Sequence, residues 1–161
     1  MLNLRKLNQF LKTNSHFIIK INISRTIPMS HSDILDVKSF KTIIIGKSAV
    51  GKSTLLLRYV DGEYIPQKAT VGMDYKFKNV SYEKANFALE LWDSAGQERF
   101  RTIVYNYFNL SKAACVVFDI TNEESLNDAK MWLQQLVLHC GNEIPKILLG
   151  NKCDLLDPQK L

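Results

Sequence analysis

The chain has 161 residues, of which 46% are hydrophobic and 23% are charged, a composition typical of one globular domain and not of a fibre or a disordered tail. Its longest uninterrupted apolar run extends from Ala113 only to Phe118, whereas a membrane-spanning helix needs about 20 residues. The sequence therefore argues against a transmembrane protein. Three cysteines at unrelated spacings, Cys115, Cys140 and Cys153, form neither a metal motif nor a disulfide framework and suit a reducing cytosol.

The net charge of +5 is concentrated at the N-terminal end of the chain. Residues 1–38 contain six basic and two acidic side chains, whereas residues 39–161 are nearly neutral. A domain that binds nucleic acid carries its positive charge on the folded surface. We therefore expect no nucleic-acid partner.

The first 28 residues differ in composition from the rest, because they contain no acidic residue and follow no consistent period. Three interpretations stay open: a disordered or spuriously included leader, with Met29 as the true start; a mitochondrial targeting peptide; or a weak membrane-surface arm. We expect residues 1–38 to form a basic, disordered extension and residues 39–161 to form the domain.

From Ser39 onward, strand patterns alternate with helical patterns. Apolar or alternating runs predict strands over residues 40–45, 74–82, 86–92, 113–120 and 144–149. A helix is predicted over residues 54–60, and a second follows the capping box that begins at Thr121. Its apolar residues recur at helical spacing: Leu126, Ala129, Leu133, Leu136 and Cys140. Strands alternating with helices predict an α/β fold with a mostly parallel sheet and helices on both faces.

The strongest motif is G-K-S-A-V-G-K-S at residues 46–53, a G-x-x-x-x-G-K-S phosphate loop between a predicted strand and a predicted helix. Its glycines let successive backbone N–H groups face one anion, and the helix N-terminus adds partial positive charge. Lys52 would reach the β- and γ-phosphates, and Ser53 would offer its hydroxyl to Mg²⁺. The residues expected to bind the phosphates are Gly46, Ser48, Ala49, Val50, Gly51, Lys52 and Ser53.

A second motif, N-K-C-D at residues 151–154, follows the last predicted strand, where ligands bind in open α/β sheets. A carboxylate there can accept hydrogen bonds from the ring N–H and the exocyclic amine of guanine, a donor pair that adenine lacks. Alone the motif is weak, but it lies about 100 residues after a phosphate loop. We therefore predict that Asn151, Lys152 and Asp154 bind guanine, with GTP or GDP as the ligand.

The third motif is W-D-S-A-G-Q-E-R-F at residues 92–100. Asp93 ends an apolar strand, as expected for a carboxylate that acts on the hydration shell of Mg²⁺. Gly96 would offer a backbone N–H to the γ-phosphate. Gln97 has an uncharged amide that can both donate to and accept from an attacking water.

With these motifs, the stretch from about residue 39 to residue 161 resembles the Ras superfamily of small GTPases and, within it, the Rab family. Three segments are similar to Rab proteins in particular: T-V-G-M-D-Y at 70–75, L-W-D-S-A-G-Q-E-R-F at 91–100 and V-F-D-I-T at 117–121. The resemblance implies the G-domain fold of phosphate-loop nucleoside triphosphatases.

The resemblance also implies further ligand contacts. Thr70 would give a hydroxyl to Mg²⁺ and a backbone N–H to the γ-phosphate, so the implied metal ligands are Ser53, Thr70 and Asp93. Thr54 would touch the α-phosphate, and Tyr64 would pack against guanine. The implied switch segments are residues 63–72 and 96–107.

As a function, the resemblance implies Mg²⁺-dependent GTP binding and slow hydrolysis to GDP, with Lys52 and Gln97 as catalytic residues, in a molecular switch for vesicle and membrane trafficking. The implied partners are a GTPase-activating protein, a guanine nucleotide exchange factor and effectors that bind the switch loops. We expect a monomer that is cytoplasmic or on the cytosolic face of endomembranes, with at most peripheral membrane contact.

The sequence departs from the Rab pattern in several places. Lys47 stands where an acid is usual, Ala49 where glycine is frequent and Ser94 where threonine is usual. Family members also continue beyond the position of Leu161 with one strand, two helices and prenylated cysteines. We therefore expect a C-terminally truncated G domain without its last strand and last two helices, with apolar residues of strands 40–45 and 113–120 open to water. The alternative function is a non-catalytic interaction module with weak or no nucleotide binding.

Overall fold

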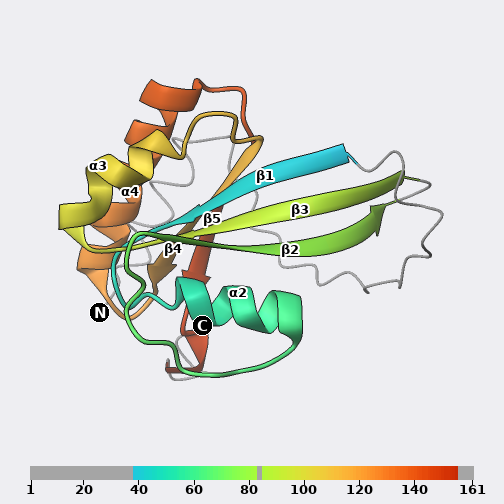
Figure 1. Ribbon diagram of the computed structural model, residues 1–161. Coiled ribbons are helices and arrows are strands. Elements are labelled where there is room, and N and C mark those ends of the chain that lie inside the picture. Colours follow the sequence, from blue (N-terminus) through green and yellow to red (C-terminus); the bar gives the residue numbers. More distant parts are fainter. Residues whose placement is uncertain (1–37, 83–84, 156–161) are drawn as a thin grey trace.

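The protein is represented by a computed structural model, which describes residues 38–82 and 85–155 (Figure 1). The extension predicted over residues 1–38 lies outside the described residues except for Lys38, and so does the alternative start at Met29. Residues 156–161 also lie outside them. Among the helices of the described part, none combines the length and the apolar character that crossing a bilayer requires.

A five-stranded sheet forms the centre of the fold, with the strand order β2-β3-β1-β4-β5. All neighbouring strands are parallel except β2 and β3, which are antiparallel. β1 is flanked on both sides, so that Ile43 lies opposite Trp92 of β3 and Ala114 of β4. The strands are β1 (Lys38–Ile45), β2 (Met73–Tyr82), β3 (Ala85–Ser94), β4 (Ala113–Asp119) and β5 (Lys146–Asn151).

Helices cover both faces of this sheet (Figure 1). The α-helices are α2 (Lys52–Asp61), α3 (Arg101–Asn106) and α4 (Glu123–Cys140), and the 3₁₀ turns are η2 (Glu98–Phe100) and η3 (Cys153–Leu155). Successive residues of a strand point to opposite faces. Ile43 and Ile45 accordingly pack with α3 and α4, whereas Ile44 packs with α2. The predicted α/β fold, a mostly parallel sheet with helices on both faces, is confirmed.

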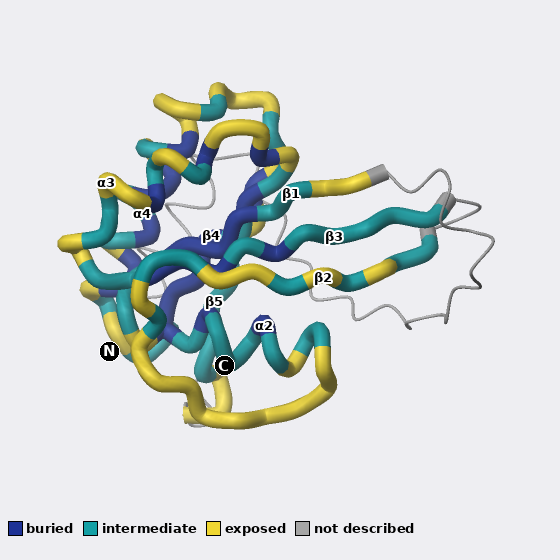
Figure 2. Tube along the Cα trace, in the orientation of Figure 1, coloured by how far each residue is buried: buried dark blue, intermediate teal, exposed yellow. Residues whose placement is uncertain are grey.

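The inner face of α4 fills the larger of the two cores. Leu126, Ala129, Leu133 and Leu136 are buried as the spacing predicts, whereas Cys140 is only partly buried. The prediction missed the largest buried side chain, that of Trp132, which is fully buried and packs edge-to-face against Tyr105 of α3. Figure 2 shows that burial is concentrated in the central strands and the sheet-facing side of α4.

The predicted capping box at Thr121 is wrong by one residue. The cap of α4 is Asn122, whose side-chain oxygen accepts from the backbone N–H groups of Glu124 and Ser125. The side chain of Thr121 is held at the end of β4 instead, because its hydroxyl donates to Asp119 Oδ1 at 2.6 Å. Asparagine is at least as good a cap as threonine.

The expectation that apolar residues of β1 and β4 lie open to water is wrong for Ile44 and Val117 but is confirmed for Phe40 of β1, which is 36% exposed. Ile44 is 8% exposed and Val117 is 1% exposed, because both pack in the core with Val50 and Leu56. Exposure also appears at the edge of the sheet. Within the described part, no strand pairs with the outer edge of β5, and Ile147 is 38% exposed there.

Two leucines on α4 allow a matched test of this packing. Leu136 is fully buried and Leu138 is 74% exposed. We expect Leu136→Ala to lower the free energy of unfolding by about 2–5 kcal/mol, because it leaves a cavity. Leu138→Ala should change it by less than about 0.5 kcal/mol. Urea unfolding followed by circular dichroism measures both, and equal costs would contradict the packing of α4 on the sheet.

Candidate functional site

The turn between β1 and α2 is shaped by two close contacts that only glycine allows. Gly46 has a φ of +149°, and a Cβ there would lie 2.1 Å from the carbonyl oxygen of Val117. Gly51 has a φ of +96°, and its Cβ would lie 2.4 Å from Asn151 Nδ2. The turn is therefore seated against β4 and β5, which fixes its place on the sheet.

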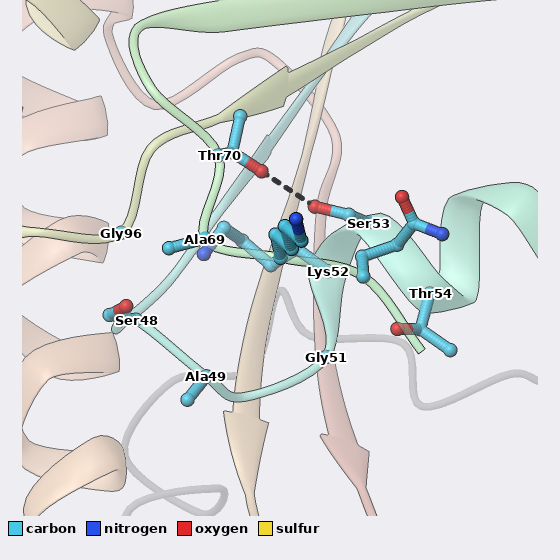
Figure 3. Close-up of a pocket in the computed structure, with 11 residues that line it drawn as sticks. Ser48, Ala49, Gly51, Lys52, Ser53, Thr54, Ala69, Thr70 and Gly96 are labelled. Atoms are coloured by element: carbon cyan, nitrogen blue, oxygen red, sulfur yellow. Dashed lines mark hydrogen bonds between the residues drawn. The ribbon is translucent and has the colours of Figure 1, made fainter. Parts of the chain in front are cut away.

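This turn surrounds a cavity of about 130 Å³ (Figure 3). The N-terminus of α2 lies at this cavity, and the free backbone N–H groups at a helix N-terminus favour anions. The lining includes predicted residues of the loop and helix, Thr70 and Gly96, together with three residues that the motifs did not identify, Gln67, Lys68 and Ala69. The predicted lining residues are Ser48, Ala49, Gly51, Lys52, Ser53, Thr54, Thr70 and Gly96.

Lys52 places a buried cation in the turn. The residue is 6% exposed, and its Nζ donates to the carbonyl oxygens of Gly46 and Lys47, each at 3.0 Å. Burial lowers the pKa of Lys52 to about 8, and the charge of Asp93 partly opposes that shift. The ammonium is thus held at the cavity by two carbonyl groups, where it can meet an anion.

Three oxygen-bearing side chains meet beside the cavity, and their chemistry fits Mg²⁺. Ser53 Oγ lies 2.8 Å from Thr70 Oγ1, and the two hydroxyls point toward one another in Figure 3. Both donate to Asp93 Oδ2, Thr70 at 3.3 Å. Asp93 Oδ1 is buried and finds no hydrogen-bond partner among residues 38–82 and 85–155. Hydroxyl and carboxylate oxygens are the ligands that Mg²⁺ prefers, with its other positions filled by water and phosphate.

The protonation of Asp93 reflects two opposed effects. Burial raises the pKa of this carboxyl group, whereas hydrogen bonds from Ser53 and Thr70 and the charge of Lys52 lower it, and the net direction is upward. The described residues contain no cluster of three or more His, Cys, Asp or Glu side chains that could hold a metal. The fit to Mg²⁺ therefore depends on this one carboxylate and the two hydroxyls.

A second cavity, of about 420 Å³, adjoins the first and shares four of its lining residues. Its volume lies in the range of small-molecule sites. It contains the predicted base-binding residues Tyr64, Asn151, Lys152 and Asp154, together with Leu55, Arg58, Pro66 and Leu155. No motif in the sequence identifies Arg58, whereas Pro66 and Gln67 lie in the segment 63–72 implied by the resemblance.

The N-K-C-D segment is tied to the phosphate loop and to β4. Asn151 Nδ2 donates to the carbonyl oxygen of Val50 at 2.8 Å. Lys152 Nζ forms an ion pair with Asp119 Oδ2 at 2.8 Å. Asp119 was missed as a site residue, because no local motif shows that the end of β4 will face residue 152.

The structure brings Gly96 to the loop but leaves Gln97 apart. A Cβ at Gly96 would lie 2.4 Å from the backbone nitrogen of Ser48, so no side chain fits between this residue and the loop. Gln97 lines neither of the two cavities. Its carbonyl oxygen accepts from the N–H of Phe100, the last residue of η2.

A phosphate loop after β1, a carboxylate at the end of β3 and an N-K-x-D motif after β5 define the class of this protein as a phosphate-loop G domain. The chain belongs to the Ras family, whose family model matches residues 41–161. The predicted resemblance to this family is thereby confirmed.

Among curated proteins, the chain is similar to the GTP-binding protein YPT1 of Saccharomyces cerevisiae, with 46% identity over 119 residues. It is also similar to the Ras-related protein RIC1 of rice, Oryza sativa, with 43% identity, and to the Ras-related protein RABD2a of Arabidopsis thaliana, with 42% identity. Each match covers 73% of this chain. The chain spans 58–59% of the length of these relatives.

The lowered pKa of Lys52 predicts a pH dependence of nucleotide affinity. Phosphate groups stabilise the ammonium, so binding takes up a proton once the free protein has lost it. We expect GDP affinity to be nearly constant up to about pH 8, where Lys52 titrates, and then to fall by up to about tenfold per pH unit. Titration with a fluorescent GDP analogue between pH 7 and pH 9 measures this.

The control is Lys52→Arg, because a guanidinium stays charged over this range. Its affinity should vary less with pH than that of the parent, and any ionisation of guanine itself affects both proteins equally. Identical profiles for the two proteins would contradict the role of the Lys52 ammonium.

Proposed function

We propose that the chain binds GTP and GDP together with Mg²⁺ and hydrolyses GTP slowly, as a Rab-like molecular switch in membrane trafficking. The observation that carries the proposal is the pair of adjoining cavities, one with the buried ammonium of Lys52 and the other with the carboxylate of Asp154. Relatives named GTP-binding protein and Ras-related protein support it.

The nucleotide would lie across both cavities. Its phosphates would accept from the N–H groups of the loop and from Lys52, and its base would meet Tyr64 and Asp154. Ser53, Thr70 and Asp93 would hold Mg²⁺, which neutralises charge on the phosphate oxygens when it is bound. Asp93 Oδ1, which is buried without a partner in the part of the chain that the structure describes, could accept from a water that hydrates this cation.

In hydrolysis, water attacks the γ-phosphorus in line, and the bond between that phosphorus and the β–γ bridging oxygen breaks to give GDP and phosphate. Lys52 would stabilise the charge that develops on the leaving oxygens, and Gln97 would orient the water. This role requires Gln97 to turn toward the phosphate cavity after GTP has bound. Without an activating protein, we expect turnover on the order of 10⁻⁴ per second, as for Ras.

The partners would be a GTPase-activating protein, an exchange factor and effectors, all binding segments 63–72 and 96–107. The first of these segments offers large exposed side chains, because Tyr64 and Val71 are each 74% exposed. The protein would work as a monomer on the cytosolic face of endomembranes.

One observation favours a second candidate, a non-catalytic interaction module with weak or no nucleotide binding. Gln97, the residue predicted to orient water, lines neither cavity. GTP affinity and single-turnover hydrolysis, measured on the purified chain, separate the two functions. Tight binding with slow turnover supports the GTPase, and the absence of both supports the module.

Base recognition by Asp154 can be tested by changing the donor and acceptor pattern. We expect Asp154→Asn to weaken GTP binding by at least about tenfold and to improve binding of xanthosine triphosphate, whose 2-oxo group accepts from the new amide. Competition between the two nucleotides measures the preference. An unchanged ratio of their affinities would exclude Asp154 from base recognition.

The proposed role of Gln97 predicts a variant that binds but hydrolyses slowly. We expect Gln97→Leu to lower the single-turnover rate by about tenfold or more and to leave GTP affinity within about twofold. The reason is that Gln97 would act on the water and not on the nucleotide. Phosphate release from preloaded protein measures the rate, and equal rates in variant and parent would remove Gln97 from the mechanism.

A further inference from the structure

A buried carboxylate at the end of β4 takes part in none of the contacts proposed so far. Asp119 is 7% exposed, and its two oxygens have different partners. Oδ2 pairs with Lys152 Nζ at 2.8 Å. Oδ1 accepts from the backbone N–H and the hydroxyl of Thr121, at 2.9 and 2.6 Å.

These bonds keep the carboxylate ionised and in place. Burial acts to raise the pKa of Asp119, but the bonds from Lys152 and Thr121 outweigh it and hold the pKa below its ordinary value. Both oxygens are engaged, so rotation of the carboxylate would break bonds on each side. The charge is therefore fixed at one point beside residue 152.

The backbone of Lys152 adopts a conformation that needs such support. Its φ is +63°, in the left-handed region that residues other than glycine rarely occupy. Residues in such conformations persist where their surroundings over-determine them. The neighbouring contacts do this: Ile120 N–H donates to the Asn151 carbonyl at 3.1 Å, and Leu155 N–H donates to the Lys152 carbonyl at 3.1 Å.

The ion pair also decides what Lys152 presents to the larger cavity. Lys152 lines that cavity, and Asp119 holds its ammonium at 2.8 Å, so we infer that its aliphatic stem faces the ligand. An apolar stem is a suitable surface for a planar purine. A released ammonium would instead be free to follow solvent or phosphate.

We propose that Asp119 is a positioning residue for the nucleotide base: by pairing with Lys152 it fixes the wall of the base cavity and keeps Asp154, two residues further on, in register with guanine. This inference rests on the proposed function, since it assumes a guanine nucleotide as the ligand. Asp119 acts through Lys152 and does not itself line either cavity.

The test is Asp119→Asn, which keeps the size of the side chain and its acceptor for Thr121 but removes the charge that holds Lys152. We expect GDP dissociation to accelerate on the order of tenfold, the effect of losing a hydrogen bond between charged partners. We also expect the preference for GDP over inosine diphosphate, which lacks the 2-amino group, to narrow. A merely structural change would weaken the binding of GDP and of inosine diphosphate equally.

The matched control is Asp128→Asn, which removes another carboxylate from an ion pair, with Arg101 at 3.4 Å, on a residue that lines neither cavity. It should release GDP at the parental rate. Parental dissociation and parental base preference in Asp119→Asn would overturn the proposal for Asp119 alone. A parent chain that binds no guanine nucleotide would overturn the proposed function, and this inference with it.

Folding of the variant is checked by circular dichroism, and a second variant approaches the contact from its other side. Lys152→Met keeps the stem, loses the ammonium and should accelerate dissociation. If Lys152→Met releases GDP at the parental rate, the pairing with Asp119 plays no part and the proposal fails.

Discussion

The burial of the Lys52 ammonium inside the turn after β1 is the constraint on which the site depends. A buried ammonium is tolerated only where oxygen atoms replace its water, and here the carbonyls of Gly46 and Lys47 do so. Those carbonyls point inward because the turn lies close against Val117 and Asn151, where a glycine is needed at each contact. The contacts of the loop with the sheet therefore hold the carbonyls that bind the ammonium of Lys52. That ammonium is then available to an anion.

The strand order distributes the other functional groups around this charge. In parallel strands the carboxyl ends lie at one edge of the sheet, and ligands bind there. β1 leads into the turn, β3 on one side ends in Asp93 and Ser94, and β4 and β5 on the other side end in Asp119 and Asn151. Asp93, which we propose helps to hold a cation, thus lies on the β3 side of β1, and Asn151, which we propose helps to bind the base, lies on the β5 side. The order β3-β1-β4-β5 therefore separates these two proposed sites.

The sequence predicted the fold class and most lining residues, because phosphate loops and strand-end motifs are local patterns with local causes. It failed where a distant contact decides. Trp132 was missed although it stands at helical spacing, three residues after Ala129 and four before Leu136; its contact with Tyr105 of α3 is one that the sequence could not show. The cap at Asn122 was missed because Asp119 engages Thr121. No sequence motif marks Asp119 as a site residue, since its role depends on Lys152, which follows β5 and not β4. The role of Gln97 stays a prediction, because the residue lies outside both cavities.

The segment between α2 and β2 connects the site to the surface. Its two ends are fixed, because Lys76 pairs with Asp61 at 2.9 Å and Lys78 donates to the Tyr59 carbonyl at the end of α2. Between these anchors residues 61–69 are all exposed (Figure 2), and Thr70 alone bonds through its side chain to Ser53 and Asp93. A segment with so few buried contacts changes conformation at low free-energy cost. Any ligand that engages Thr70 therefore acts on this exposed segment, because the anchors confine the response to the residues between them.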